Sequence, residues 1–248
     1  MKSAFALLFC FAPAVASAQT VVLDPGHGGH KPGTKSGAGV YEKTIVLGVA
    51  EVAKRSLEAK GLKVILTRAG DEHVSLDARI DLANREGAAA FVSIHANHAP
   101  VPERRGIETY ILAAQASDES TLALSHQEDE EVDPEGAGFG GSSEGGDLAG
   151  ILDDLGRMAA HQDAALLARK VQDRAGAVGG LKPSRGLRQG PFKVLRGAKM
   201  PAVLVELGYL SNPGQATFLA SGKGQNAAGE AIAKGVYEYL RAVGPRAR

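Results

Sequence analysis

Short apolar runs alternate with helix-spaced segments along most of this 248-residue chain. Two segments, 43–60 and 75–87, carry apolar residues at helical spacing and end near a glycine. The runs that flank them have the length and the β-branched content of strands and lie at 21–23, 62–67, 89–95 and 107–112. This alternation predicts an α/β fold, a single domain with a mostly parallel twisted sheet covered by helices on both faces.

The second half of the chain continues the pattern after an interruption at about 113–156. We expect two further strands at 192–195 and 202–205, and helices at 164–178 and 226–241. The run at 202–205 is uniformly apolar, which predicts that this strand lies in the centre of the sheet. The interruption then forms an insertion after the fourth strand.

The insertion is strongly acidic, although the whole chain has 28 basic and 28 acidic residues. No Lys or Arg occurs between Arg105 and Arg157, whereas twelve Asp and Glu lie between Asp118 and Asp154. The charge run and the Gly/Ser-rich stretch at 136–146 are typical of a solvated loop. Apolar residues at helical spacing from 148 to 155 predict that a helix begins there. The balanced charge of the whole chain gives no reason to expect a nucleic-acid partner.

The first eighteen residues have the features of a secretory signal peptide. They carry one charge, an apolar stretch interrupted by Pro13, and a small-residue cleavage site at 16–18. The stretch is too short to span a bilayer, so we expect no transmembrane segment in the mature chain. We therefore expect a signal peptide at 1–18 and one catalytic domain at 19–248, located in the periplasm. Cys10 is the only cysteine, so the mature domain has no disulfide.

Four polar residues stand at the ends of predicted strands or in the loops beside them: His27, Glu42, His95 and Glu206. Because the carboxyl ends of parallel strands meet at one edge of a sheet, residues far apart in the sequence can converge there. Two imidazoles and one carboxylate, with a fourth position open to water, make the ligand set of a hydrolytic zinc site. The pattern predicts one zinc ion per chain.

Hydrolysis at such a site needs a second carboxylate. Zinc lowers the pKa of bound water to roughly 7, and a general base must then accept a proton and deliver it to the leaving amine. Glu206 is the candidate, because it follows an apolar strand where desolvation raises a carboxyl pKa. Taken singly, His95 could be a core histidine and Glu206 could pair with Arg68 or Arg79. The four residues together favour a hydrolytic site.

Four short motifs carry a resemblance to a known family. They are Leu-Asp-Pro-Gly-His-Gly-Gly at 23–29, Tyr-Glu-Lys at 41–43, Ser-Ile-His-Ala-Asn at 93–97 and Val-Glu-Leu-Gly-Tyr-Leu-Ser-Asn at 205–212. In order and spacing they resemble the signature blocks of zinc-dependent N-acetylmuramoyl-L-alanine amidases. The resemblance implies zinc held by His27, Glu42 and His95, with Glu206 as the catalytic carboxylate. It also implies hydrolysis of the amide between N-acetylmuramic acid and L-alanine in peptidoglycan.

The residues next to the expected ligands have less defined roles. Asn97 is a candidate for contact with the substrate or for orienting His95. His30 and His98 are expected at the rim of the site rather than in the ligand set.

The acidic insertion resembles the regulatory segment of periplasmic cell-division amidases, in which a helix blocks the zinc cleft until a partner protein displaces it. An acidic segment is attracted to zinc, and a carboxylate in the water position prevents hydroxide formation. Candidates for this carboxylate are Glu128, Glu131 and Glu144. If the insertion is autoinhibitory, deleting 119–146 raises hydrolysis of purified peptidoglycan; the alternative is a solvated insertion without catalytic consequence.

The resemblance implies a role in cell-wall remodelling and daughter-cell separation, with peptidoglycan as substrate, a periplasmic activator protein as partner and a monomeric enzyme. Two alternatives stay open. A zinc carboxypeptidase or endopeptidase would cut elsewhere in the stem peptide, although position 30 is His rather than the Glu of a His-x-x-Glu pattern. A catalytically inactive wall-binding or activator protein would have lost one of the four site residues, and all four are present.

Overall fold

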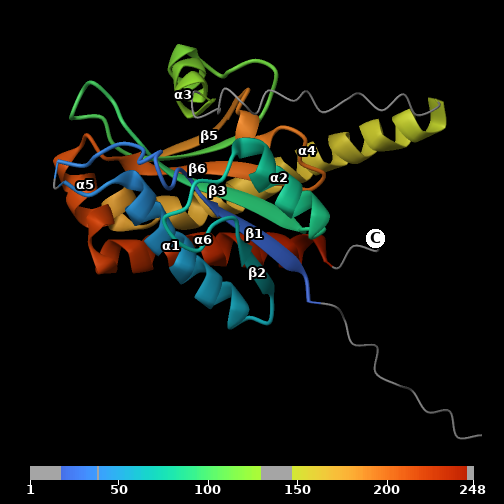
Figure 1. The fold of residues 1–248 in the computed structure, drawn as a ribbon, viewed down its shortest axis with the longest axis horizontal. Coiled ribbons are helices and arrows are strands. Elements are labelled where there is room, and N and C mark those ends of the chain that lie inside the picture. Colours follow the sequence, from blue (N-terminus) through green and yellow to red (C-terminus); the bar gives the residue numbers. More distant parts are fainter. Residues whose placement is uncertain (1–17, 38, 130–146, 245–248) are drawn as a thin grey trace, which may run out of the picture.

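Six strands form one sheet in the computed structural model, which describes residues 18–37, 39–129 and 147–244 (Figure 1). The strands are β1 (Thr20–Pro25), β2 (Lys63–Leu66), β3 (Ala90–Asn97), β4 (Ile107–Leu112), β5 (Ser184–Gly190) and β6 (Ala202–Tyr209). Their spatial order is β2-β1-β3-β6-β4-β5, and of the neighbouring pairs β4–β6 is antiparallel while the others are parallel. The mostly parallel α/β sheet predicted from the sequence is confirmed, with β6 in its interior.

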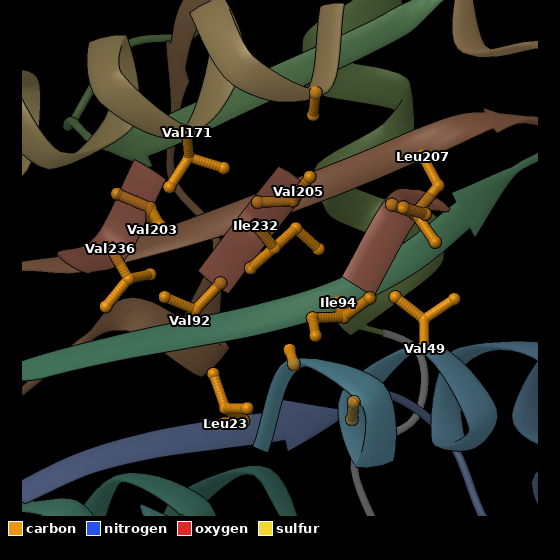
Figure 2. Close-up of a cluster of buried hydrophobic side chains, with 14 of the residues drawn as sticks. Leu23, Val49, Val92, Ile94, Val171, Val203, Val205, Leu207, Ile232 and Val236 are labelled. Carbon is orange, nitrogen blue, oxygen red and sulfur yellow. The ribbon is translucent and has the colours of Figure 1, made fainter. Parts of the chain in front are cut away.

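Helices cover both faces of this sheet. They are α1 (Glu42–Glu58), α2 (Leu76–Arg85), α3 (Glu119–Asp129), α4 (Asp147–Gly176), α5 (Pro213–Ala220) and α6 (Gly222–Val243), with short 3-10 turns η1 (Gly179–Leu181) and η2 (Lys193–Leu195). Helices α1, α4 and α6 pack on one face, where Val49, Val171 and Ile232 meet apolar strand residues (Figure 2). Helices α2 and α3 and the turn η2 pack on the other face around Phe91 and Leu204.

The alternation of side chains along each strand decides which residues reach the second face. On β3, Val92 and Ile94 point into the first core, so Phe91, Ser93 and His95 point to the opposite face. At the carboxyl ends of the parallel strands β1, β3 and β6, the second face changes from apolar to polar. The site residues gather at this polar end, beneath α3.

One predicted strand is wrong, and the elements β5 and α5 were not predicted. The run at 192–195 is not a strand: it contains η2, and Phe192 and Leu195 are apolar because they pack into the second core. The edge strand is instead β5, whose sequence Ser-Arg-Gly-Leu-Arg-Gln-Gly lacks apolar alternation. An edge strand pairs on one side and is partly exposed, so its sequence carries a weak strand signal. The short helix α5 was also not expected.

The helix expected at 148–155 is confirmed, and most of the stretch expected as a solvated loop lies outside the described residues. The region 113–156 is partly helical. It contains α3, a helix packed on the sheet, and the first residues of α4, which runs without a break to Gly176. Residues 130–146, with Glu131 and Glu144, lie outside the described residues, as does most of the expected signal peptide. Among the described residues, no helix is both long enough and apolar enough to cross a membrane.

Candidate active site

Three predicted metal ligands converge at the carboxyl end of the sheet. His27 lies on the turn after β1, Glu42 is the first residue of α1, and His95 lies near the end of β3. Glu42 Oε1 is 2.7 Å from His27 Nε2 and 3.4 Å from His95 Nδ1. All three side chains are buried, with His27 only 5% exposed.

The spacing of these atoms fits a bound zinc ion. Two ligands that each lie about 2 Å from a tetrahedral zinc are about 3.3 Å apart. The contacts of 2.7 and 3.4 Å lie close to this value, and two imidazole nitrogens with one carboxylate oxygen are ordinary zinc donors. This donor set can therefore hold a divalent metal.

Glu42 is held in place and ionised by its surroundings. Its Oε1 accepts a hydrogen bond from the Ala96 amide at 2.8 Å, and its Oε2 accepts one from the Thr34 amide at 3.0 Å. Burial raises the pKa of Glu42, but the charges and hydrogen bonds of His27 and His95 outweigh it and hold this pKa below its usual range. A carboxylate that binds a metal must be ionised, and the two backbone amides that donate to Glu42 favour this form.

Two buried arginines hold the turn that carries His27. His27 has a φ of 59°, a left-handed conformation that is costly for a residue other than glycine. Arg68 Nη2 donates to the Gly26 carbonyl at 2.8 Å, and Arg79 Nη2 donates to the His27 carbonyl at 2.8 Å. These charged hydrogen bonds fix the strained backbone and thereby the position of the imidazole.

Arg79 also pairs with Asp24, a fully buried carboxylate on β1, at 2.6 Å. Asp24 further accepts hydrogen bonds from the hydroxyls of Thr67 and Ser93. Burial raises the pKa of Asp24, but Arg79 and the two hydroxyls outweigh it and lower this pKa. Arg68 and Arg79 are thus engaged with this turn and with Asp24, so the alternative in which they pair with Glu206 is wrong.

Two glycines give the backbone room beside the ligands. A Cβ at Gly26 would lie 2.4 Å from His95 Nε2, inside any real contact distance. Gly33 has a φ of 66°, and a Cβ there would lie 2.6 Å from His27 Cδ2 and 2.7 Å from Glu42 Oε2. Both positions need glycine because the backbone passes directly over the ligand side chains.

Glu206 stands beside the ligands without a hydrogen bond of its own. It is paired in register with His95 across β3 and β6, and it is 0% exposed. Within the described part of the chain, neither of its carboxylate oxygens has a hydrogen-bond partner. Burial, followed by the nearby charge of Glu128, raises the pKa of Glu206 well above its ordinary value, although His95 opposes this rise. A buried carboxylate left unsatisfied in this way is typical of a functional group.

A fourth donor comes from the insertion. Glu128, near the end of α3, places its Oε2 2.9 Å from His95 Nδ1 and 3.9 Å from His27 Nε2. His27, His95 and Glu128 form a buried group whose donor atoms all lie within 4.8 Å of one another. Of the three insertion carboxylates considered from the sequence, the structure places Glu128 at the metal ligands.

Contacts at both ends hold α3 over the site. Asp118 Oδ1 accepts a hydrogen bond from the Thr121 amide at the start of the helix. At the other end, Asp129 Oδ1 accepts one from the Lys193 amide at 2.8 Å. Between them Leu124 is buried in the second core. The helix is therefore docked on the sheet and is not a solvated segment.

Comparison with known proteins shows the family to which the chain belongs. The family model described as N-acetylmuramoyl-L-alanine amidase matches residues 21–238. The chain belongs to this amidase family. It is 34% identical over 220 residues to the amidase AmiC of Neisseria meningitidis, and 32% identical over 222 residues to the amidase AmiA of Escherichia coli. The first alignment covers 89% of this chain and 52% of the relative; the second covers 90% and 76%.

A solved structure shows the same fold. The amidase AmiC2 of Nostoc punctiforme superposes with a TM-score of 0.66 at 30% identity, covering 90% of this chain and 97% of that one. The family predicted from the sequence is confirmed. The chain spans about half the length of the Neisseria relative.

The remaining predicted residues of the amidase lie around the four donors. Asn97 ends β3, is 7% exposed, and its carbonyl accepts a hydrogen bond from the Leu210 amide. Its contact with substrate stays a prediction. His30 and His98 are exposed and are not part of the donor group, and the His30 ring lies 4.4 Å from that of His73.

The sequence did not point to Glu108, which lies beside Glu206 in the amidase. The antiparallel pairing of β4 with β6 sets Glu108 in register with Glu206, and Glu108 is buried. Tyr209 donates its hydroxyl to Glu108 Oε2 at 2.7 Å, and the Nε atoms of Arg185 and Arg188 each lie 3.0 Å from Oε1. A glutamate at the start of a strand carries no signal of this role before the strand order is known.

Proposed function

We propose that this chain is a periplasmic zinc amidase that cleaves the bond between N-acetylmuramic acid and the L-alanine of the stem peptide. The convergence of His27, Glu42 and His95 beside a buried, unsatisfied Glu206 carries this proposal. The family match supports the bond type, and the signal-like first eighteen residues support the periplasm. Cell-wall remodelling during daughter-cell separation is the corresponding biological role.

In this proposal His27, Glu42 and His95 hold one zinc ion. Bound zinc would supply the Lewis-acid chemistry that makes water nucleophilic near neutral pH. Glu206 stands next to His95, so its free carboxylate can take a proton from the attacking water and deliver it to the leaving amine. Burial and the charge of Glu128 raise the pKa of Glu206, which makes its carboxylate a stronger base than that of an exposed glutamate.

We further propose that α3 inhibits the enzyme. Glu128 reaches the two imidazoles at the place where a hydrolytic site keeps an open position. The helix also covers the polar end of the sheet where a substrate would have to lie. Activity then requires that α3 moves away, and a periplasmic activator protein that binds it would provide the energy for this displacement.

The experiment that tests the activity is Glu206→Gln in the zinc-loaded protein. The amide keeps the shape of the side chain but cannot act as a base, so metal content should stay at one zinc per chain while hydrolysis is lost. Glu230→Gln, at an exposed position of α6, is the matched control and should keep its activity. Full activity of Glu206→Gln would overturn the assigned role.

Mass spectrometry of muropeptides after digestion identifies the bond that is cut. Release of intact stem peptides with a free L-alanine amine is the expected result. Products shortened within the stem peptide would instead indicate a carboxypeptidase or an endopeptidase.

A further inference from the structure

A cluster of cationic side chains lies around Glu108, the residue of β4 that pairs in register with Glu206. The Nε atoms of Arg185 and Arg188 both contact Glu108, and Tyr209 bonds the other oxygen of this carboxylate. Arg104 donates to the Tyr209 hydroxyl at 3.0 Å and lies over its ring at 5.3 Å. Two guanidinium groups thus contact the Glu108 carboxylate, and a third reaches it through the Tyr209 hydroxyl.

The second carboxylate of this cluster comes from the segment that carries α3. Arg188 Nη1 pairs with Asp118 Oδ2, and Arg104 Nη2 donates to the hydroxyl of Ser120 in the first turn. Among the described residues, Arg188 therefore forms ion pairs with two carboxylates, Glu108 within the fold and Asp118 beside the helix. If Asp118 moves away together with α3, Arg188 loses this ion pair and the cluster keeps an excess of positive charge.

We propose that Arg188 is a substrate-binding residue that takes a carboxylate of the stem peptide in the place of Asp118. This inference rests on the proposed function, because it requires both the peptidoglycan substrate and the displacement of α3. The Arg188 side chain is 21% exposed with the helix in place, so the departure of Asp118 opens its outer nitrogen to the cleft. A guanidinium binds a carboxylate through two parallel hydrogen bonds and is the side chain best suited to this ligand.

The length of α3 indicates which carboxylate is bound. Asp118 and Glu128 are ten residues apart, so they are separated by about 15 Å along the helix. An extended peptide covers this distance in about four or five residues. A ligand that reaches from the metal donors to Arg188 therefore presents a carboxylate several residues from the bond that is cut, near the free end of the stem peptide.

The test compares two synthetic substrates, a muramyl pentapeptide with free carboxylates and the same compound with its distal carboxylates converted to carboxamides. Both are measured in a zinc-loaded double variant. Glu128→Gln removes the carboxylate of α3 from the metal ligands, and Asp118→Asn removes the charge that competes for Arg188. Adding Arg188→Gln should lower the ratio of kcat/KM for the carboxylate over the carboxamide substrate by at least about ten-fold. Arg188→Lys should recover part of this ratio.

Arg185→Gln in the same background is the matched control. It removes a contact with Glu108 like that of Arg188 but has no contact with Asp118, so the ratio should stay within about two-fold. An unchanged ratio in Arg188→Gln, or an equal fall in Arg185→Gln, would overturn the inference. Circular dichroism of each variant confirms that the fold is kept.

Binding of the free stem pentapeptide separates this inference from the proposed function. Calorimetry in the double variant Glu128→Gln/Asp118→Asn should show binding of the free pentapeptide, and the affinity should fall both when Arg188→Gln is added and when the carboxamide peptide is used. If no variant cleaves the muramyl bond but this pattern of binding is seen, the proposed function fails and the carboxylate site stands. If Arg188→Gln leaves the affinity for the pentapeptide unchanged, the proposed carboxylate site is wrong, whether or not the protein cleaves the muramyl bond.

Discussion

Glu206 carries a stability cost that follows from its role. Both oxygens are buried without a hydrogen bond within the described residues, and an unsatisfied buried polar group destabilises a fold by about 1–3 kcal/mol. Active sites commonly hold such groups because the reaction needs the lone pairs that folding leaves free. The cost depends on pH, because the ionised form is the one that burial disfavours.

This dependence gives a prediction for Glu206→Gln in the zinc-free protein. The pKa of Glu206 in the folded state lies well above its ordinary value of 4.5. The free energy of unfolding of the wild type therefore decreases as the pH rises from about 4.5 toward the folded-state pKa. Gln does not titrate, so the variant should have the higher melting temperature, and the gain should be larger at pH 8 than at pH 5. Equal gains at both pH values in calorimetric unfolding would contradict the raised pKa.

Arg79 connects the fold to the ligand turn, since it holds both Asp24 and the His27 carbonyl. Arg79→Gln leaves a buried charge without its partner and should lower the free energy of unfolding by about 3–5 kcal/mol in urea denaturation. Adding Asp24→Asn removes that charge and should restore a large part of the loss. Arg85→Gln, exposed on the same helix, should change stability little. Additive losses in the double variant would show that the pair is not coupled.

At the scale of elements, α3 is the segment most open to displacement. Its ends are held by polar contacts of Asp118 and Asp129, and a single leucine, Leu124, lies in the core cluster. Few apolar contacts give a low free energy of local opening, which a binding partner can supply. By contrast, α1 and α6 contribute many residues to the first core and are part of the framework.

Glu128→Gln should therefore activate the zinc-loaded enzyme. The amide is a weaker metal ligand and has no charge to attract the ion, so hydrolysis of purified peptidoglycan should rise several-fold over wild type. Glu119→Gln lies in the first turn of the same helix, is exposed, and should leave the rate unchanged. A Glu128→Gln rate equal to or below that of wild type, with zinc still bound, would argue against inhibition by α3.

Prediction from the sequence succeeded for most elements and failed where the local signal was weak. Strands β1, β3 and β6 were expected because apolar runs of this kind occur in buried parallel strands. The edge strand β5 was missed because most of its residues are polar or glycine. A strand was wrongly predicted at 192–195 because the buried residues Phe192 and Leu195 make this 3-10 turn as apolar as a strand. Helix α3 was missed for a similar reason, since its buried side includes Thr121 and Ser125 beside Leu124.

For the whole molecule, metal binding should add to the stability of the fold. The donors come from three separate elements, so zinc bound to them favours the folded state and, at a thousand times its dissociation constant, raises the free energy of unfolding by about 4 kcal/mol. Removing the metal with a chelator should lower the melting temperature. His27→Ala should abolish this zinc-dependent difference, whereas His30→Ala, at an exposed neighbouring position, should keep it. A zinc effect that survives His27→Ala would show that the metal binds elsewhere.

The sequence by itself determined the α/β class, the amidase motifs and the four residues His27, Glu42, His95 and Glu206. The periodic spacing of apolar residues and the short motifs can be identified from the order of residues alone. The tertiary structure decided that β4 runs antiparallel beside β6, which sets Glu108 next to Glu206, and that α3 brings Glu128 to the imidazoles. These contacts join segments far apart in the chain, and their free energy arises only when the segments pack together.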